Sequence, residues 1–210
     1  MRYPVLLLVF ALPAFFSAGK SAAQTVISLK NPGFEADGRA AGTNITGWIN
    51  LGANDETPPD IQPGWFGVKL PAQEGDNYIG LVVRETGTWE GIGQRLSSVM
   101  EKGSSYSFSV WLARCNTYSS PLRGGGEPKQ FTAPTILKIW GYNTRTAQEE
   151  LLAESTAIGH SKWVLYEFEL SPSLADYDEI DLMVYYAPGY ENQNGNLLLD
   201  ACSNLVKIEK

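Results

Sequence analysis

The chain has 210 residues, of which 43% are hydrophobic, and its 23 acidic side chains outnumber its 16 Lys and Arg, which gives a formal net charge of −7. An acidic chain with no cluster of basic residues does not suit nucleic acid or an anionic membrane surface, because both are bound through neutralisation of phosphate. We therefore expect no nucleic acid partner and no membrane insertion, and the length fits one all-β domain.

The N-terminus has the pattern of a cleaved secretory signal. Arg2 precedes an apolar run over residues 5–16, and small residues follow as far as Ala23. The apolar run is too short to span a bilayer. We expect cleavage after Ala23, so that residues 1–23 are a signal peptide and residues 24–210 form a single domain. The protein would then be exported, to the periplasm, the outer surface or the extracellular space.

The rest of the chain shows period-two alternation in short segments separated by Gly, Pro, Asn and Asp, which is typical of strands and turns. The clearest segment is Ser105–Arg114, where aromatic and aliphatic residues form one face and Trp111 lies among small residues on the other. The pattern predicts a β-sandwich. The predicted strands are Tyr78–Arg84, Gly91–Leu96, Ser105–Arg114, Thr135–Tyr142, Trp163–Leu170, Ile180–Tyr186 and Asn196–Ile208.

Two long loops interrupt this pattern. Four prolines between residues 50 and 73 exclude a central strand there, because proline donates no ladder hydrogen bond. A second loop covers residues 118–134. Long loops at the rim of a rigid sandwich are where binding residues usually lie.

The two cysteines leave two alternatives open. In an oxidising exported compartment Cys115 and Cys202 could form a disulfide, and two buried free thiols are the other possibility. A metal site built from them and the single histidine, His160, is a poor alternative.

Four motifs follow one another along the chain. The first is Asn31-Pro32-Gly33-Phe34-Glu35 with Trp48, the second is Gly75-Asp76-Asn77-Tyr78-Ile79-Gly80 with Gln94, the third is Lys102-Gly103 with the strand from Tyr106 to Arg114, and the fourth is Leu199-Asp200 with Leu205 and Ile208. Their order resembles galactose-binding-like jelly rolls, which include many carbohydrate-binding modules of bacterial glycoside hydrolases. The resemblance implies an all-β jelly-roll sandwich of two antiparallel sheets that opens with a strand at the first motif.

A second group of short stretches is similar to exported Bacteroidetes-type proteins, and this likeness does not by itself give a function. These stretches are Pro59-Asp60-Ile61, Tyr78 to Arg84, Trp89-Glu90, Gln94 and Trp140-Gly141.

The resemblance also implies a structural calcium ion that joins the first and last strands. By position its carboxylate ligands would be Glu35 and Asp200. Calcium takes 6–8 oxygen ligands, so backbone carbonyls and Asn31 or Asp37 would have to complete the shell. The alternative is that Glu35 caps a turn and Asp200 is a solvated strand end.

Sugar binding needs aromatic faces against the apolar side of a pyranose, flanked by planar hydrogen-bonding side chains. Burial in the core is the alternative for each aromatic residue, and a surface ion pair is the alternative for Arg84 with Glu90. Trp111 is the most informative position because small residues surround it. The candidate binding residues are Arg84, Trp89, Glu90, Gln94, Trp111, Arg114, Trp140 and Tyr142, with Tyr185 and Tyr186 as further aromatic candidates.

Signals for catalysis are poor. The lone His160 is expected in a turn, and the sequence has no nucleophile elbow, zinc-ligand pair or phosphate loop. The first hypothesis is therefore a non-catalytic domain that binds a glycan or polysaccharide. The second is an adaptor that binds a protein partner in a cell-surface complex, and the third is a polysaccharide-degrading enzyme.

Overall fold

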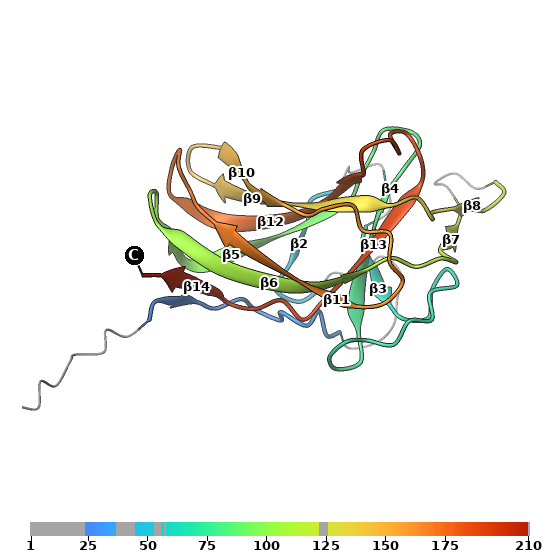
Figure 1. Cartoon of the computed structure of the whole chain (residues 1–210), viewed down its shortest axis with the longest axis horizontal. Coiled ribbons are helices and arrows are strands. Elements are labelled where there is room, and N and C mark those ends of the chain that lie inside the picture. Colours follow the sequence, from blue (N-terminus) through green and yellow to red (C-terminus); the bar gives the residue numbers. More distant parts are fainter. Residues whose placement is uncertain (1–23, 37–44, 53–55, 57, 122–125, 210) are drawn as a thin grey trace, which may run out of the picture.

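The computed structural model describes residues 24–36, 45–52, 56, 58–121 and 126–209, so the predicted signal peptide and Asp37 lie outside the described residues. Two antiparallel sheets pack face to face, as the resemblance implied (Figure 1). No helix among the described residues is long and apolar enough to cross a bilayer.

The first sheet has seven strands, and β11 pairs with β6 at its edge. The other neighbours follow the order β1, β14, β6, β13, β4, β3. The bounds are β1 Val26–Ile27, β14 Leu205–Ile208, β6 Ser105–Ala113, β13 Gly195–Asp200, β4 Tyr78–Val83, β3 Asp60–Gln62 and β11 Val164–Leu170.

The second sheet has five strands in the order β10, β9, β12, β5, β2. A short ribbon of β7 and β8 lies outside both sheets, at one end of the molecule (Figure 1). The bounds are β10 Gln148–Glu154, β9 Thr135–Asn143, β12 Tyr177–Tyr186, β5 Gly91–Met100, β2 Ile49–Asn50, β7 Ser119–Ser120 and β8 Lys129–Gln130.

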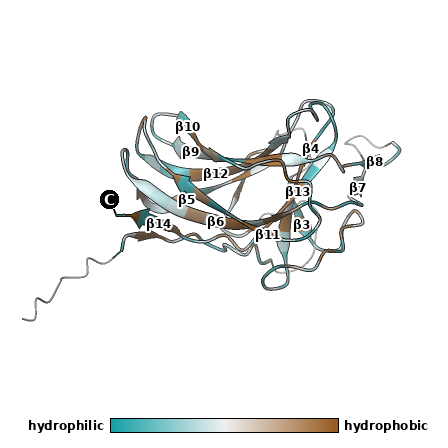
Figure 2. Ribbon diagram, in the orientation of Figure 1, coloured by the Kyte–Doolittle hydropathy of each residue, from teal (hydrophilic) through white to brown (hydrophobic). Residues whose placement is uncertain are grey.

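The main core lies between the sheets. Alternate residues of β6, such as Phe108 and Val110, are buried in one hydrophobic cluster with Ile139 of β9 and Leu182 of β12. Figure 2 shows the hydrophobic colouring in the middle of the strands and the hydrophilic colouring at the hairpin ends. Because strand residues alternate between faces, the neighbours of these core residues point away from the sandwich.

A second core lies on the outer face of the seven-stranded sheet. There Tyr78, Val82 and Leu198 are buried in a cluster with Tyr118 and Phe131 from the loops. The Tyr118 ring also stacks on Phe66, with centroids 5.8 Å apart. The long loops predicted from the prolines and glycines therefore cover part of this face.

All seven predicted strands are present, with changes at their ends. The predicted strand Asn196–Ile208 divides into β13 and β14, because Ala201 has a φ of 45° and breaks the ladder. The sequence pattern did not reveal β10, which lies at a sheet edge and carries a bulge between Leu151 and Ala153. In the described part of the proline-rich segment the one strand is β3, which lies at the edge of the seven-stranded sheet, where proline is tolerated.

The first motif of the family resemblance was wrongly expected to be a strand. Asn31 and Phe34 have φ values of 48° and 56°, outside the strand region. The Asn31 side chain accepts a hydrogen bond from the Glu35 N–H at 2.9 Å and donates one to the Glu35 carbonyl at 2.9 Å. The motif is therefore a turn, and Phe34 packs on Trp48 with ring centroids 5.2 Å apart.

The two cysteines are free and buried. Cys115 belongs to the second core, whereas Cys202 belongs to the main core. The alternative of two buried thiols is the one that the structure contains.

Candidate functional site

The outer face of the five-stranded sheet carries aromatic and acidic side chains, and its central ones belong to neither hydrophobic cluster of the described residues. We call it the five-strand face. Its central residues alternate with core residues such as Ile139 and Leu182, so they point outward. The face is defined by Glu149 and Leu151 of β10, Lys138, Trp140 and Tyr142 of β9, Glu179, Asp181, Met183 and Tyr185 of β12, and Gly91, Gly93 and Arg95 of β5.

One row of paired residues crosses the whole face. Leu151, Trp140, Asp181, Gly93 and Ile49 are consecutive cross-strand partners. The residues at its two ends, Leu151 and Ile49, are 39% and 43% exposed, so the row is open at both edges. At Gly93 an added Cβ would stand 2.5 Å from the Asp181 Oδ1 atom. The missing side chain therefore leaves room over β5 for the Asp181 carboxyl and for the Leu51 side chain, whose Cδ1 atom would stand 3.1 Å from the same Cβ.

Trp140 and Asp181 each have a polar atom without a hydrogen-bond partner among the described residues. These atoms are the Trp140 Nε1, a donor, and the Asp181 Oδ1, and both are covered by neighbouring atoms. Covered polar atoms in folded proteins are nearly always satisfied. Both residues are partly exposed, so each side chain still borders the open face. Unmet hydrogen bonds in the middle of an open face indicate a binding position.

The charges of the face favour a protonated Asp181. Burial, followed by the charges of Glu179 and Glu149, raises the pKa of Asp181 to about 7, and Arg95 opposes this shift. Arg95 is itself engaged, since its Nε lies 2.5 Å from a Glu179 carboxylate oxygen. Near neutral pH the Asp181 carboxyl can therefore serve as donor or acceptor.

Aromatic rings continue the face on either side of this row. Tyr142 pairs with Glu179 across the strands, toward one end. Toward the other end, the Lys138 Nζ lies 4.8 Å from the centroid of the Tyr185 ring. Trp89 approaches Tyr185, with centroids 5.0 Å apart and ring planes at 35°. Trp89 also packs against the main core, so it forms the margin of the face.

Three of the predicted sugar-binding residues, Trp140, Tyr142 and Trp89, thus come together on this face or at its margin. Of the further aromatic candidates, Tyr185 belongs to the face, whereas Tyr186 packs against the core. The sequence reading missed Asp181, Glu179 and Arg95. The signal for Asp181 was present in the alternation of β12, where it falls between the core residues Ile180 and Leu182.

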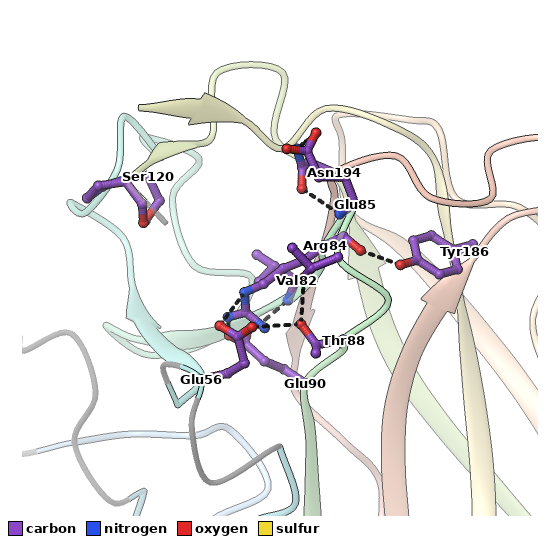
Figure 3. A network of polar contacts seen from close by, with 11 residues as sticks. Glu56, Val82, Arg84, Glu85, Thr88, Glu90, Ser120, Tyr186 and Asn194 are labelled. Atoms are coloured by element: carbon purple, nitrogen blue, oxygen red, sulfur yellow. Dashed lines mark hydrogen bonds and ion pairs between the residues drawn. The ribbon is translucent and has the colours of Figure 1, made fainter. Parts of the chain in front are cut away.

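Arg84 and Glu90 form a buried network elsewhere (Figure 3). Both are less than 5% exposed, so they are not the surface ion pair considered from the sequence. Arg84 donates to a Glu90 carboxylate oxygen, and its Nε lies 3.4 Å from Glu56. The other Glu90 oxygen accepts the Val82 N–H at 3.0 Å. Burial raises the pKa of Glu90 to about 8, although Arg84 opposes this.

The network extends to Asp60 of β3 and to Tyr118, which belongs to the loops that cover the seven-stranded sheet. Tyr118 donates its hydroxyl to an Asp60 carboxylate oxygen. Burial raises the pKa of Asp60 to about 6, and the Tyr118 hydrogen bond and the charge of Arg84 oppose the shift. The network fastens loops to the sheet edge at the level of β3 and β4.

Gln94, Arg114 and Trp111 each lie apart from the five-strand face. Gln94 is 1% exposed and makes two hydrogen bonds to the backbone of Lys30, at 2.6 and 2.9 Å. Arg114 fastens loops by donating to the carbonyls of Thr132 and Gly159.

Trp111 lies on the outer face of the seven-stranded sheet. Its cross-strand partners are Leu165 on β11 and Asp200 on β13. It is partly exposed and belongs to neither hydrophobic core. The structure therefore separates Trp111 from Trp140 by the full thickness of the sandwich.

Glu35 and Asp200, the predicted calcium ligands, both approach the turn at residues 73–77. Glu35 accepts the Asp76 N–H at 3.1 Å, and one Asp200 oxygen accepts the N–H groups of Gln73 and Glu74 at 2.7 and 3.1 Å. Burial raises the pKa of Asp200 to about 6, and the Glu35 charge adds to this.

A divalent cation would relieve the repulsion between these two carboxylates, so the negative charge of the pair is compatible with bound calcium. The described residues hold no cluster of three or more Asp, Glu, His or Cys side chains arranged for a metal. The remaining ligands would therefore have to be carbonyls and Asn31. Calcium at this turn stays a prediction.

Comparison of the sequence with protein-family models and with curated proteins gives no match. Solved structures do share the fold. A cyclase from Fischerella sp. TAU is 15% identical, with 89% of this chain and 98% of that chain covered and a TM-score of 0.55. The CBM22-1 xylan-binding domain of Paenibacillus barcinonensis Xyn10C is 17% identical, with 90% and 97% covered and a TM-score of 0.53. At such identities the likeness shows a fold of the carbohydrate-binding-module kind and no more.

Proposed function

We propose that this protein is an exported, non-catalytic domain that binds a polysaccharide on the five-strand face. The observation that carries the proposal is the row that is open at both edges, with the partly exposed Trp140 and Asp181 at its centre and with Tyr142 and Tyr185 on either side. Aromatic rings stack on the apolar side of sugar rings, and nearby polar groups fix the hydroxyls. The carbohydrate-binding-module fold supports this reading by analogy.

The test compares Trp140→Ala with Trp111→Ala. Both variants remove a partly exposed tryptophan from the outer face of a sheet, but only Trp140 lies on the five-strand face. We expect affinity electrophoresis against a polysaccharide panel to show retention for the wild type and for Trp111→Ala. Retention should fall at least about tenfold for Trp140→Ala, since truncating a central aromatic anchor costs about 2 kcal/mol or more. The proposal is contradicted if both variants lose retention equally, or if no polysaccharide of the panel retains the wild type.

Acid catalysis is a second candidate at the same position. The Asp181 carboxyl has a pKa raised to about 7 by burial and by its acidic neighbours, which suits a proton donor near neutral pH. A catalyst releases products from the polysaccharide panel and loses this activity in Asp181→Asn. A binding domain retains the polysaccharide and releases nothing.

Protein docking on the outer face of the seven-stranded sheet is a third candidate. The observation that favours it is the exposure of Leu165 and Ile208, 42% and 37%, on the same side as Trp111. An adaptor of this kind would co-purify with a partner that Trp111→Ala releases, and it would show no glycan retention.

A further inference from the structure

The choice of sugar on the five-strand face depends on the charges around Asp181, so the following inference rests on the proposed function. Charged groups reach Asp181 from each neighbouring element. Glu179 lies on its own strand, Glu149 comes from β10, and Arg95 comes from β5. On β9 the nearest charged residue is Lys138, one row away from Trp140.

Both cations of the face are already engaged. The Arg95 guanidinium contacts Glu179 at 2.5 Å and lies 4.0 Å from Asp178. The Lys138 ammonium lies over the Tyr185 ring and 3.8 Å from Glu154. A second anion placed beside Asp181 would therefore meet carboxylates whose counter-charges are occupied.

Ligand charge has a large effect at this position. Two like charges about 4 Å apart near a protein surface repel by roughly 4 kcal/mol at an effective dielectric constant of about 20. A uronic acid stacked on Trp140 would bring a further negative charge beside Glu179 and Glu149, whose charges already disfavour an anion at Asp181. A neutral sugar brings a hydroxyl instead, which can accept a hydrogen bond from a protonated Asp181 carboxyl.

We propose that Trp140 and Asp181 form a subsite for a neutral sugar ring that excludes uronic acids, and that Asp181 holds this ring in its protonated form. The Gly93 gap keeps the carboxyl flat against the sheet, where a stacked ring would cover it. Covering a carboxyl removes water and disfavours its charge. Sugar binding and proton uptake are therefore coupled.

The pKa of Asp181 is raised to about 7 by burial and the neighbouring acids, so its protonation changes within a pH range where the folded protein can be studied. Below pH 6 most Asp181 is protonated and ready to bind. Above pH 8 binding has to include uptake of a proton, so the affinity falls.

The experiment measures affinity by isothermal titration calorimetry at pH 6 and pH 8.5 for the wild type, Asp181→Asn and Glu149→Gln. The neutral probes are arabinoxylan, mixed-linkage β-glucan and galactomannan, and the acidic probes are polygalacturonate and alginate. For the wild type we expect at least one neutral probe to bind about tenfold more weakly at pH 8.5, with no binding of the acidic probes.

The two variants separate the protonation of Asp181 from the overall charge. Asp181→Asn keeps the shape of the side chain and cannot ionise, so its affinity for the neutral probe should be equal at both pH values. Glu149→Gln removes a charge that raises the Asp181 pKa, so its pH transition should remain and move to lower pH. Intrinsic tryptophan fluorescence should show a component that titrates near pH 7 in the wild type and is lost in Asp181→Asn, because Trp140 adjoins the carboxyl.

The outcomes distinguish the two proposals. If a neutral probe binds with the same affinity at both pH values, or if polygalacturonate binds as well as a neutral probe, the inference is wrong and the proposed function stands. If no probe of either charge binds at either pH, both are overturned.

Discussion

The outer faces of the two sheets are built from the same alternating pattern but are used differently. On the seven-stranded sheet, loops cover Tyr78, Val82 and Leu198 with a second hydrophobic core. On the five-stranded sheet, Trp140 and Asp181 stay partly exposed and each has a polar atom without a partner. The covered face contributes to stability through its second hydrophobic core, whereas the open face leaves a partly exposed tryptophan and carboxyl available to a ligand.

Removing the buried cation tests the stabilising role of the covered side and should have the largest effect. Arg84→Met leaves Glu90 and Asp60 buried without their counter-charge. Breaking a buried ion pair from one side costs about 3–5 kcal/mol. We expect chemical denaturation to show a loss of this size, with glycan retention unchanged in the folded fraction. A decrease of less than about 1 kcal/mol in the free energy of unfolding would show that the buried network does not stabilise the edge of the sheet.

Ionisation of Asp181 on the five-strand face should lower the stability of the folded protein at alkaline pH. The folded-state pKa of Asp181 is raised above its unfolded value of 3.8 to about 7, so its contribution to stability is complete below pH 4 and is lost as the pH rises to 7 and above. Asp181→Asn removes that loss. We expect the variant to be more stable than the wild type by about 1–3 kcal/mol at pH 8.5. The two should differ little at pH 4.

Glu90, Asp60 and Asp200 also have raised pKa values, at about 8, 6 and 6, all chiefly through burial. They act in the same direction, so the wild type should lose stability between pH 5 and pH 8.5. Asp181→Asn should reduce this slope without abolishing it. Equal slopes for the wild type and the variant in urea titrations would contradict the shift at Asp181.

The sequence predicted the sandwich well because the signal was local. Alternation over Ser105–Arg114 is a property of the segment itself and gave β6 nearly to the residue. The open face could not be located in this way, since alternation marks two faces and does not say which one the loops will cover. Trp111 was singled out for its small neighbours, whereas Trp140 lies between Lys138 and Tyr142 on the outer face of the other sheet.

The polar residues of the site illustrate the same limit. Arg84, Glu90 and Gln94 looked like a ligand-binding set because they are close in sequence to Trp89. In the fold all three are buried and bind the protein's own backbone or side chains. Asp181 is far from Trp140 in sequence and becomes its neighbour only through strand pairing. Cross-strand register is a tertiary property that single-strand patterns do not contain.

Calcium binding at the turn of residues 73–77 should have a smaller effect on stability, and it tests one site on the covered sheet. The Glu35 and Asp200 carboxylates both hold this turn, and the Glu35 charge helps to raise the Asp200 pKa. Bound calcium would neutralise that repulsion, so millimolar Ca²⁺ should raise the Tm by a few degrees, and a chelator should reverse the change. Glu35→Gln removes one carboxylate from an exposed position and should abolish the response.

The five-strand face should not contribute to the rise of the Tm with Ca²⁺, so a variant on that face serves as the control. Asp181→Asn leaves Glu35 and Asp200 untouched, so its Tm should rise with Ca²⁺ by the same amount as that of the wild type. A response that disappears in Asp181→Asn and persists in Glu35→Gln would move the cation to the open face. It would also change the interpretation of Asp181 from a neutral hydrogen-bonding acid to an ionised metal ligand, because calcium binds the deprotonated carboxylate.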